Sequence, residues 1–146
     1  LIPTLEDVTE EKIFLKYPKG ICLVPPGVAL ANLFENSLGT SFTKIRLEQL
    51  ESVLQKALVE DLEIAENLKI NTRSDLIRME ITKSIFQDFC KKNGKKSNVC
   101  SLLGCPLCSS LACVLVRSIG KPLVIEKIQT SKDGTTIEAY YKIIEE

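Results

Sequence analysis

The sequence predicts an α+β fold in which helices pack on a four-stranded antiparallel sheet. Leucines recur at helical spacing between residues 44 and 65, and two pairs of segments alternate apolar and polar residues. Asp133-Gly134 separates the second pair as a tight turn does. Four antiparallel strands with helices on one side form a layered arrangement around one core. With 146 residues, the chain is expected to form one domain over residues 1–146.

The charge balance argues against polyanionic partners. Lys and Arg total 19, Asp and Glu total 19, and charged residues make up 26% of the chain. With no net field to attract phosphates or anionic lipids, we expect neither a nucleic-acid partner nor a membrane partner. The longest uncharged stretch, residues 101–116, is too short to span a bilayer comfortably and predicts a buried helix.

The sequence carries no secretory signal, so a cytoplasmic protein is expected. It begins with Leu1 rather than Met, which predicts that some N-terminal residues are missing. In a reducing compartment the 6 cysteines favour metal binding or free thiols over disulfides, with hyperthermophiles as the exception. Plentiful Lys, Glu and Ile, without Trp or His, point faintly to a thermophilic source.

The first elements are short. Residues 13–17 and 21–24 suit extended segments joined by a turn, because Pro18 and Gly20 lie between them. A short amphipathic helix is expected to open after Pro25-Pro26 and to close at Gly39. Its helically spaced apolar residues are Leu30, Leu33, Phe34 and Leu38.

A longer helix is predicted from Lys44 to about Ala65. Its apolar stripe consists of Leu47, Leu50, Leu54, Leu58 and Leu62. Such a stripe is more commonly part of the core than a partner-binding surface, and dimerisation through it is left open.

A hairpin follows, with Leu68 and Ile70 on one strand, a turn at residues 71–75, and the alternating residues of a second strand over 77–81. Residues 84–92 suggest one more short helix, followed by a loop over residues 93–98.

The central helix is predicted to run from Pro106 to about Ile119. Proline suits the first helical position, and Gly120 and Pro122 end the helix. The β-formers at 123–130 and 135–144 predict the closing hairpin.

Four of the six cysteines cluster ahead of this helix. They are Cys90, Cys100, Cys105 and Cys108. Because the chain has no histidine, a soft-metal site would need thiolates, and four thiolates suit tetrahedral zinc. The spacing matches no common zinc finger, so an iron-sulfur cluster and ordinary buried thiols remain alternatives.

The position of the last two cluster cysteines suits a metal ligand or a nucleophile. Cys105 and Cys108 flank the start of the central helix, where free amide groups and the helix dipole favour thiolates. The lysine-rich loop at residues 91–96 would partly offset a four-thiolate centre, and by itself it reads as a solvated loop. Cys22 and Cys113 are expected to be core residues.

Several catalytic classes lack their residues. Without histidine there is no Cys-His or Ser-His mechanism and no zincin motif, and the glycine patterns of P-loops and dinucleotide sites are absent. No catalytic residue is therefore assigned. Carboxylates such as Glu126 and Glu138 could act as acid or base, but strand carboxylates are usually solvated.

The segment from Cys105 to Ile143 resembles the C-terminal half of the 4-vinyl reductase domain family. The shared features are a small-residue helix after a cysteine, the turn Gly120-Lys121-Pro122, and a strand, glycine turn and strand ending at Ile143. The resemblance implies a small-molecule or hydrocarbon-binding module rather than an enzyme. Zinc-containing sensors of this type use a cysteine like Cys105 with three further ligands. Lys127, Thr130 and Glu138 stand at those three positions, so that site is not carried over.

These observations give three functional hypotheses. The first is a cytoplasmic module that binds a small apolar ligand and is held by a structural zinc, with Ser109, Ser110 and Ala112 leaving room for the ligand. The second is a redox or iron-sulfur protein that uses the cysteine cluster. The third is a structural subunit that forms a homodimer.

Overall fold

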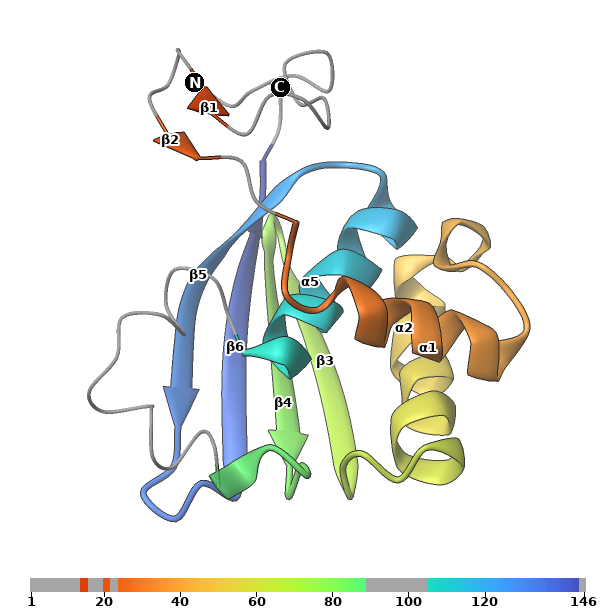
Figure 1. Cartoon of the computed structure of the whole chain (residues 1–146), viewed down its shortest axis with the longest axis vertical. Helices are drawn as coiled ribbons and strands as arrows, with labels where there is room; N and C mark the ends of the chain where they lie inside the picture. The colour runs from red at the N-terminus through yellow and green to blue at the C-terminus, as the bar shows by residue number, and fades with distance from the viewer. Residues whose placement is uncertain (1–13, 16–19, 22–23, 89–104, 145–146) are drawn as a thin grey trace.

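The computed structural model describes residues 14–15, 20–21, 24–88 and 105–144. It confirms the predicted α+β class: a four-stranded antiparallel sheet carries helices on one face. The four strands are β3 (Asn67–Arg73), β4 (Leu76–Thr82), β5 (Leu123–Thr130) and β6 (Thr136–Ile143). Their order in the sheet is β3-β4-β6-β5, so two sequence-local hairpins join through β4 and β6 (Figure 1).

The pairing of the two hairpins aligns the apolar residues of both. Met79 of β4 lies opposite Ala139 of β6, and Ile81 lies opposite Ile137. Since side chains alternate between the two sides of a strand, this register puts all four on the helix-covered face. All four are buried.

The N-terminal strands β1 (Phe14–Leu15) and β2 (Gly20–Ile21) form a separate antiparallel pair. This agrees with the two extended segments joined by a turn that the sequence predicts.

Two helices agree closely with prediction. They are α1 (Val28–Leu38) and α5 (Pro106–Ile119). Each is followed by a glycine with left-handed backbone, Gly39 at φ 70° and Gly120 at φ 75°, and the N–H of each closes the last helical turn. Only glycine adopts this conformation without a side-chain clash, which explains why both helices end there.

The long helix predicted over residues 44–65 is present but shorter: the α-helix α2 (Leu47–Leu54) continues without a gap into the π-helix η3 (Gln55–Asp61). The 3₁₀ turn η2 (Phe42–Lys44) precedes α2 and is separated from it by two residues. The break before α2 arises because the Arg46 N–H bonds the Gln49 side chain at 3.3 Å and so caps a new helix. Leucine spacing alone could not reveal this polar cap.

The first hairpin turn is shorter than predicted. Strand β3 continues to Arg73, and only Ser74 and Asp75 connect it to β4. Asn71 and Arg73 are exposed positions of β3, where polar residues are expected. Their polarity does not mark a turn, and the predicted turn over residues 71–75 is therefore too long. Ser74 adopts a left-handed φ of 58°, which allows the tight reversal.

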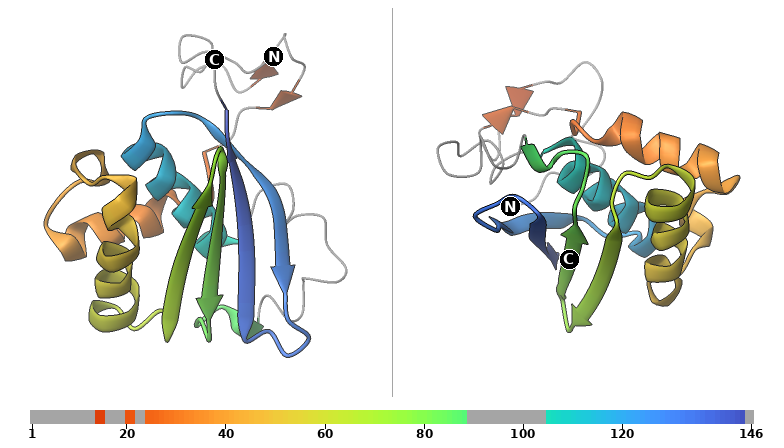
Figure 2. Two further views of the ribbon diagram at one scale, coloured as in Figure 1. Left: turned by 180° about the vertical axis from the view of Figure 1, so that it is seen from behind. Right: turned by 90° about the horizontal axis from the view of Figure 1, so that it is seen from below.

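The helices lie in two levels on the sheet. Figures 1 and 2 show α5 crossing the sheet, α2 beside strand β3, and α1 lying over α5. Residues 87 and 88 begin a helical turn after β4, which is the described part of the helix predicted over residues 84–92.

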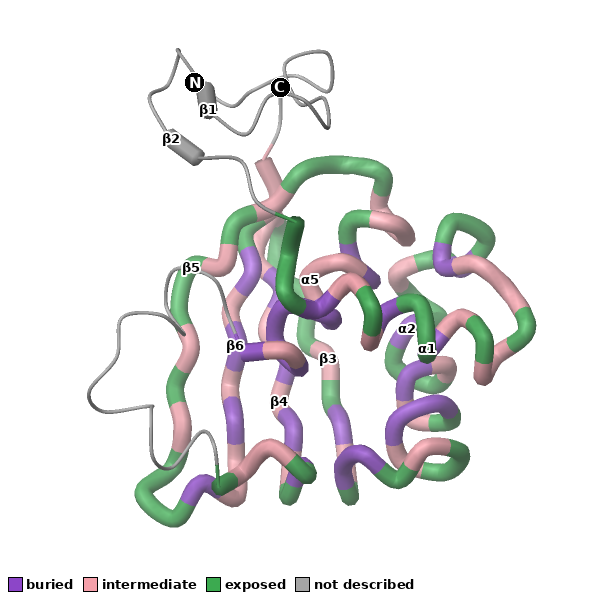
Figure 3. The backbone as a smooth tube through the Cα atoms, in the orientation of Figure 1, coloured by how far each residue is buried: buried purple, intermediate pink, exposed green. Residues whose placement is uncertain are grey.

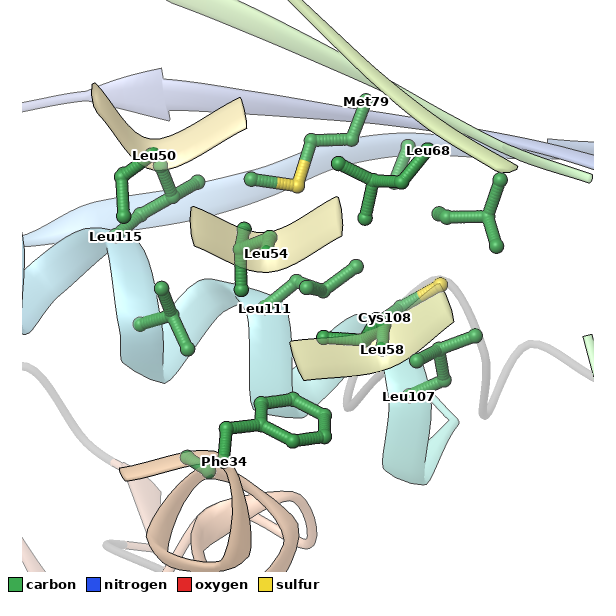
Figure 4. Close-up of a cluster of buried hydrophobic side chains, with 14 of the residues drawn as sticks. Phe34, Leu50, Leu54, Leu58, Leu68, Met79, Leu107, Cys108, Leu111 and Leu115 are labelled. Atoms are coloured by element: carbon green, nitrogen blue, oxygen red, sulfur yellow. The ribbon is translucent and has the colours of Figure 1, made fainter. Parts of the chain in front are cut away.

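The core lies between the sheet and the helices. Figure 3 shows buried residues on the inner side of α5 and at alternate positions along β4 and β6. Figure 4 shows Phe34 of α1 reaching toward Leu111 of α5, and Met79 of β4 reaching toward α2. The largest fully buried side chains come from both helices and strands: Tyr141, Phe34, Phe42, Leu50, Leu54, Leu58, Leu68, Ile77, Met79, Ile81, Leu107 and Leu111.

Candidate functional site

The start of α5 places two of the predicted metal ligands in one turn of helix. Cys105 is the residue before the helix, with extended backbone (φ −73°, ψ 169°), and Pro106 takes the first helical position. The Cys105 Sγ accepts a hydrogen bond from the backbone N–H of Cys108 at 3.3 Å. Cys105 is therefore the N-cap of the central helix, a role usually filled by Ser, Thr, Asp or Asn.

Both thiols lie inside the molecule. Cys105 is 3% exposed and Cys108 is 0% exposed. Figure 4 shows Cys108 beside Leu58 in the hydrophobic cluster. A thiolate at such a position needs compensating positive charge, because burying an isolated charge is very costly.

Tyr141 joins this turn to the sheet. Its hydroxyl donates a hydrogen bond to the backbone carbonyl of Cys108 at 2.7 Å, and the side chain is fully buried on β6. Burial raises the pKa of the Tyr141 hydroxyl well above its ordinary value, and the neighbouring Cys108 and Cys105 raise it further. Tyr141 is therefore a neutral donor at any physiological pH.

The structure describes only two of the four predicted metal ligands and does not test the set. Cys105 and Cys108 are brought together, whereas Cys90 and Cys100 lie outside the described residues. Within the described ranges 24–88 and 105–144, no three Cys, Asp or Glu side chains are grouped so as to hold a metal ion. The four-cysteine zinc site therefore stays a prediction, as does the iron-sulfur alternative.

Cys113 is separate from this pair. It lies further along α5 and is partly buried, in agreement with the expected core position. Burial raises the pKa of its thiol, and the nearby charge of Arg117 partly opposes that shift. Cys22 lies outside the described residues.

The small residues of α5 serve close helix contact. The Gly27 N–H donates to the Ser109 hydroxyl at 3.0 Å, and the Ser110 hydroxyl donates to the Leu107 carbonyl at 2.6 Å. A Cβ on Gly27 would lie 2.0 Å from the Ser110 backbone nitrogen, so the chain entering α1 touches the backbone of α5. The space beside Ser109 and Ser110 is therefore occupied by the chain around Gly27. It does not hold the ligand that the small size of these residues suggested.

Arg117 holds the other end of the α1–α5 contact. Its guanidinium bonds Glu35 at 2.7 Å and the side-chain oxygen of Asn32 at 2.9 Å. The second carboxylate oxygen of Glu35 accepts from the Phe42 N–H at 2.7 Å. The pair is only 20–25% exposed, so it fixes how α1, η2 and α5 sit together.

The leucine stripe of the second predicted helix faces inward. Leu50, Leu54 and Leu58 are completely buried, and Leu47 and Leu62 pack against the core. This stripe is intramolecular core, so a homodimer, which stays a prediction, would need another surface.

Two residues of the site escaped the sequence interpretation. Alternation in the last strand indicates that Tyr141 points inward, but nothing local indicates that its hydroxyl meets Cys108, which is 33 positions away. Gly27 follows two prolines and looked like part of a helix start. Its contact with α5 depends on a tertiary approach that no short motif encodes.

The comparisons with known proteins correct the family. A family model matches residues 3–141, and its description is Domain of unknown function (DUF7982). No curated protein and no solved structure gives a significant match. Among the described residues, no helix combines the length and apolar character needed to cross a bilayer. The resemblance to the 4-vinyl reductase family is wrong, because a different family model covers nearly the whole chain. The chain belongs to the family Domain of unknown function (DUF7982).

Proposed function

We propose that this domain is a non-catalytic module whose fold is anchored by a zinc ion bound to the thiolates of Cys90, Cys100, Cys105 and Cys108. The observation that carries the proposal is the cap of α5. The Cys105 sulfur accepts the N–H of Cys108 at 3.3 Å while both side chains are almost fully excluded from solvent. An N–H donor to sulfur favours the thiolate form, which is the form that binds zinc.

Electrostatics supports a cation near this pair. The helix N-terminus stabilises a negative sulfur, but it supplies only about half an elementary charge. Two thiolates buried here would require more positive charge than a helix N-terminus supplies, and a divalent ion is the usual source in closed structural sites. Tyr141 adds no charge, since its raised pKa keeps it protonated.

The proposed role of the metal is structural. It would fix the first turn of α5, which Tyr141 already joins to β6, and so hold helix and sheet in register. The proposal does not extend to the apolar ligand, because Ser109 and Ser110 are packed against Gly27 and the family that suggested such a ligand is not the one matched.

A dithiol redox centre is the second candidate. Cys105-Pro-Leu-Cys108 is a C-x-x-C motif at a helix start, with a hydrogen bond on its first sulfur, as in thiol-disulfide exchange proteins. The exposures of 3% and 0% weigh against it, because an exchanging thiol must be reached by its partner.

The two candidates are separated by metal content and mass. The protein is purified without oxygen or chelator and examined by elemental analysis and native mass spectrometry. One zinc per chain is expected, with loss of zinc and a lower Tm in Cys105→Ser and retention of zinc in the matched control Cys113→Ser. A brown, iron-containing sample would replace zinc by a cluster. A metal-free chain that becomes lighter by two hydrogens when oxidised glutathione is added, with the glutathione reduced to two thiols, and that regains this mass on reduction would support the dithiol centre instead.

A further inference from the structure

The sheet has one face that no described segment covers. Figure 2, left, shows the four strands in front of the helices, with this face toward the viewer. We call it the open face and define it as the outward-pointing residues of β3, β4, β6 and β5. The register defines its centre, because Arg78 lies opposite both Asn71 and Tyr140, and Tyr140 lies opposite Lys127.

The open face concentrates positive charge. It carries the cations Lys69, Arg73, Arg78, Lys127 and Lys142. Its carboxylates are Glu80 and Glu138, and Glu126 lies beside them at the bulge of β5. Five cations therefore meet at most three carboxylates, although the charges of the whole chain balance at 19 each. Such segregation produces a local field even when the net charge is zero.

The centre of the open face is already ordered. Arg78 bonds Glu138 at 2.8 Å and Glu80 at 3.0 Å, and the Tyr140 hydroxyl donates to Glu138 at 3.0 Å. The Arg78 bond, followed by that of Tyr140, lowers the pKa of Glu138, so the network stays charged through the physiological range. Side chains that are already fixed lose little entropy when a partner binds.

The rim of the open face remains available. Lys69, Arg73 and Lys142 are exposed, and Lys127 lies over the Tyr140 ring with its ammonium 5.7 Å from the ring centre. At one end, Lys142 lies between Leu76 and Val124 in the register. Val124 is 45% exposed, which places an apolar contact beside a cation.

The charge pattern selects among possible occupants. A second copy would bring the same excess of cations against itself across a twofold axis, which is repulsive. A nucleic acid would need stacking platforms and an uninterrupted cationic track. Here Lys127 lies over the ring of Tyr140, and the carboxylates of Glu80 and Glu138 interrupt the track.

We infer that the open face binds an acidic segment of a protein partner, with carboxylates on the rim cations and an apolar side chain beside Val124. Discrete carboxylates can avoid Glu80 and Glu138 in a way that a uniform phosphate backbone cannot. A hollow of about 460 Å³ lies where β5 and β6 meet their connecting turn, and it gives room for a polar side chain of the segment beside Glu138. Its lining residues are Ile128, Gln129, Thr130, Ser131, Thr136 and Glu138. This inference is independent of the metal.

The probe is a fluorescent amphipathic peptide of Glu and Leu, compared with a Lys and Leu peptide and a labelled single-stranded oligonucleotide. Binding to the intact chain is followed by fluorescence anisotropy. The acidic peptide is expected to bind in a salt-dependent manner. Amide shifts in an NMR titration are expected on the four strands of the open face, β3, β4, β6 and β5.

Charge reversal at the rim supplies the decisive comparison. Lys69→Glu with Lys142→Glu should weaken binding of the acidic peptide by about tenfold or more. The matched control, Lys44→Glu with Lys56→Glu, changes the net charge equally, lies on the helical segments η2 and η3 away from the open face, and should leave the affinity within about twofold. Equal weakening by both variants, preference for the lysine peptide, tighter binding of the oligonucleotide, or shifts confined to other elements would each overturn the inference.

Discussion

Tyr141 illustrates how one atom can connect a helix start to a sheet. Replacing it with Phe removes the donor to the Cys108 carbonyl and leaves the ring in place. A buried hydrogen bond contributes about 1 kcal/mol, so Tyr141→Phe should lower the free energy of unfolding by about that amount.

Urea denaturation measures this effect. Tyr140→Phe, which removes a hydroxyl from the partly buried Glu138 network, is the control and should cost less. Equal losses of unfolding free energy in the two variants would show that the buried hydrogen bond of Tyr141 stabilises the protein no more than the partly buried one of Tyr140.

Asp133 gives a pH dependence with a definite sign. Hydrogen bonds from the Thr135 hydroxyl, the Thr135 N–H and the Ser131 hydroxyl lower its pKa from 3.8 to about 2. A carboxyl with a depressed folded-state pKa contributes stability above the unfolded value and loses it as pH falls through the folded value. The advantage of the native protein over Asp133→Asn should therefore be constant above about pH 4 and shrink toward pH 2.

Thermal unfolding of the native chain and this variant, scanned over pH, tests that window. Asp75→Asn, in the other hairpin turn, serves as the control. A difference in stability between the native chain and Asp133→Asn that does not change with pH would contradict the lowered pKa of Asp133.

At the scale of elements, the α1–α5 contact depends on a missing side chain. A Cβ at position 27 would lie 2.0 Å from the Ser110 nitrogen and 2.5 Å from the Ser109 carbonyl carbon, both backbone atoms that cannot rotate away. Gly27→Ala should therefore cost about 3 kcal/mol or more, at or beyond the upper end for overpacking.

The matched control is Gly39→Ala. That position has φ +70° but no heavy atom within 4 Å of the added carbon, so it should cost about 1 kcal/mol from backbone strain alone. Urea denaturation of both variants compares their losses in the free energy of unfolding. A smaller loss for Gly27→Ala than for Gly39→Ala would mean that α1 can shift away from α5.

Strand β3 has its outer backbone groups bound by neighbouring helical side chains. The Glu51 carboxylate accepts from the Ile70 N–H at 3.0 Å, and the Gln55 amide donates to the Leu68 carbonyl at 2.6 Å. Glu51→Ala should speed hydrogen exchange of the Ile70 amide by about tenfold, since one hydrogen bond is lost. Glu48→Ala, on the same helix, should leave this amide unchanged, and an unchanged rate in Glu51→Ala would show that the contact does not protect the strand.

For the molecule as a whole, the core unites both hairpins and the helices. Met79 is fully buried and reaches from β4 toward Leu50 and Leu54 (Figure 4). Met79→Ala should lower stability by about 3 kcal/mol, and helix and sheet signals should still unfold together.

Circular dichroism and tyrosine fluorescence in the same urea titration test this expectation. Ile85→Ala, at a residue that is 67% exposed, should have almost no effect. Separate transitions for the two signals would contradict one cooperative domain.

The sequence predicts correctly those features of the fold that depend only on neighbouring residues. Gly39, Pro106 and Gly120 set helix ends, and Asp133-Gly134 set the last turn, because each needs only its own backbone geometry. The boundaries of α2 and η3 were missed because a leucine stripe is equally compatible with one helix or several.

The site was less predictable than the fold. Cysteine spacing located Cys105 and Cys108 at a helix start, but the contacts of Tyr141 and Gly27 arise only when β6 and α1 reach α5. Long-range contacts of this kind leave no periodic trace in the sequence.

The irregular pairing of β5 has a consequence for crowded solutions. Between Ile125 and Lys127 an extra residue interrupts the ladder with β6, and such an insertion bends and twists its strand. Strands of different molecules pair along edge strands that are straight and regular. The edge strand β5 is bent by its bulge and carries the exposed Lys127. The bulge therefore makes β5 a poor template for pairing with a strand of another molecule.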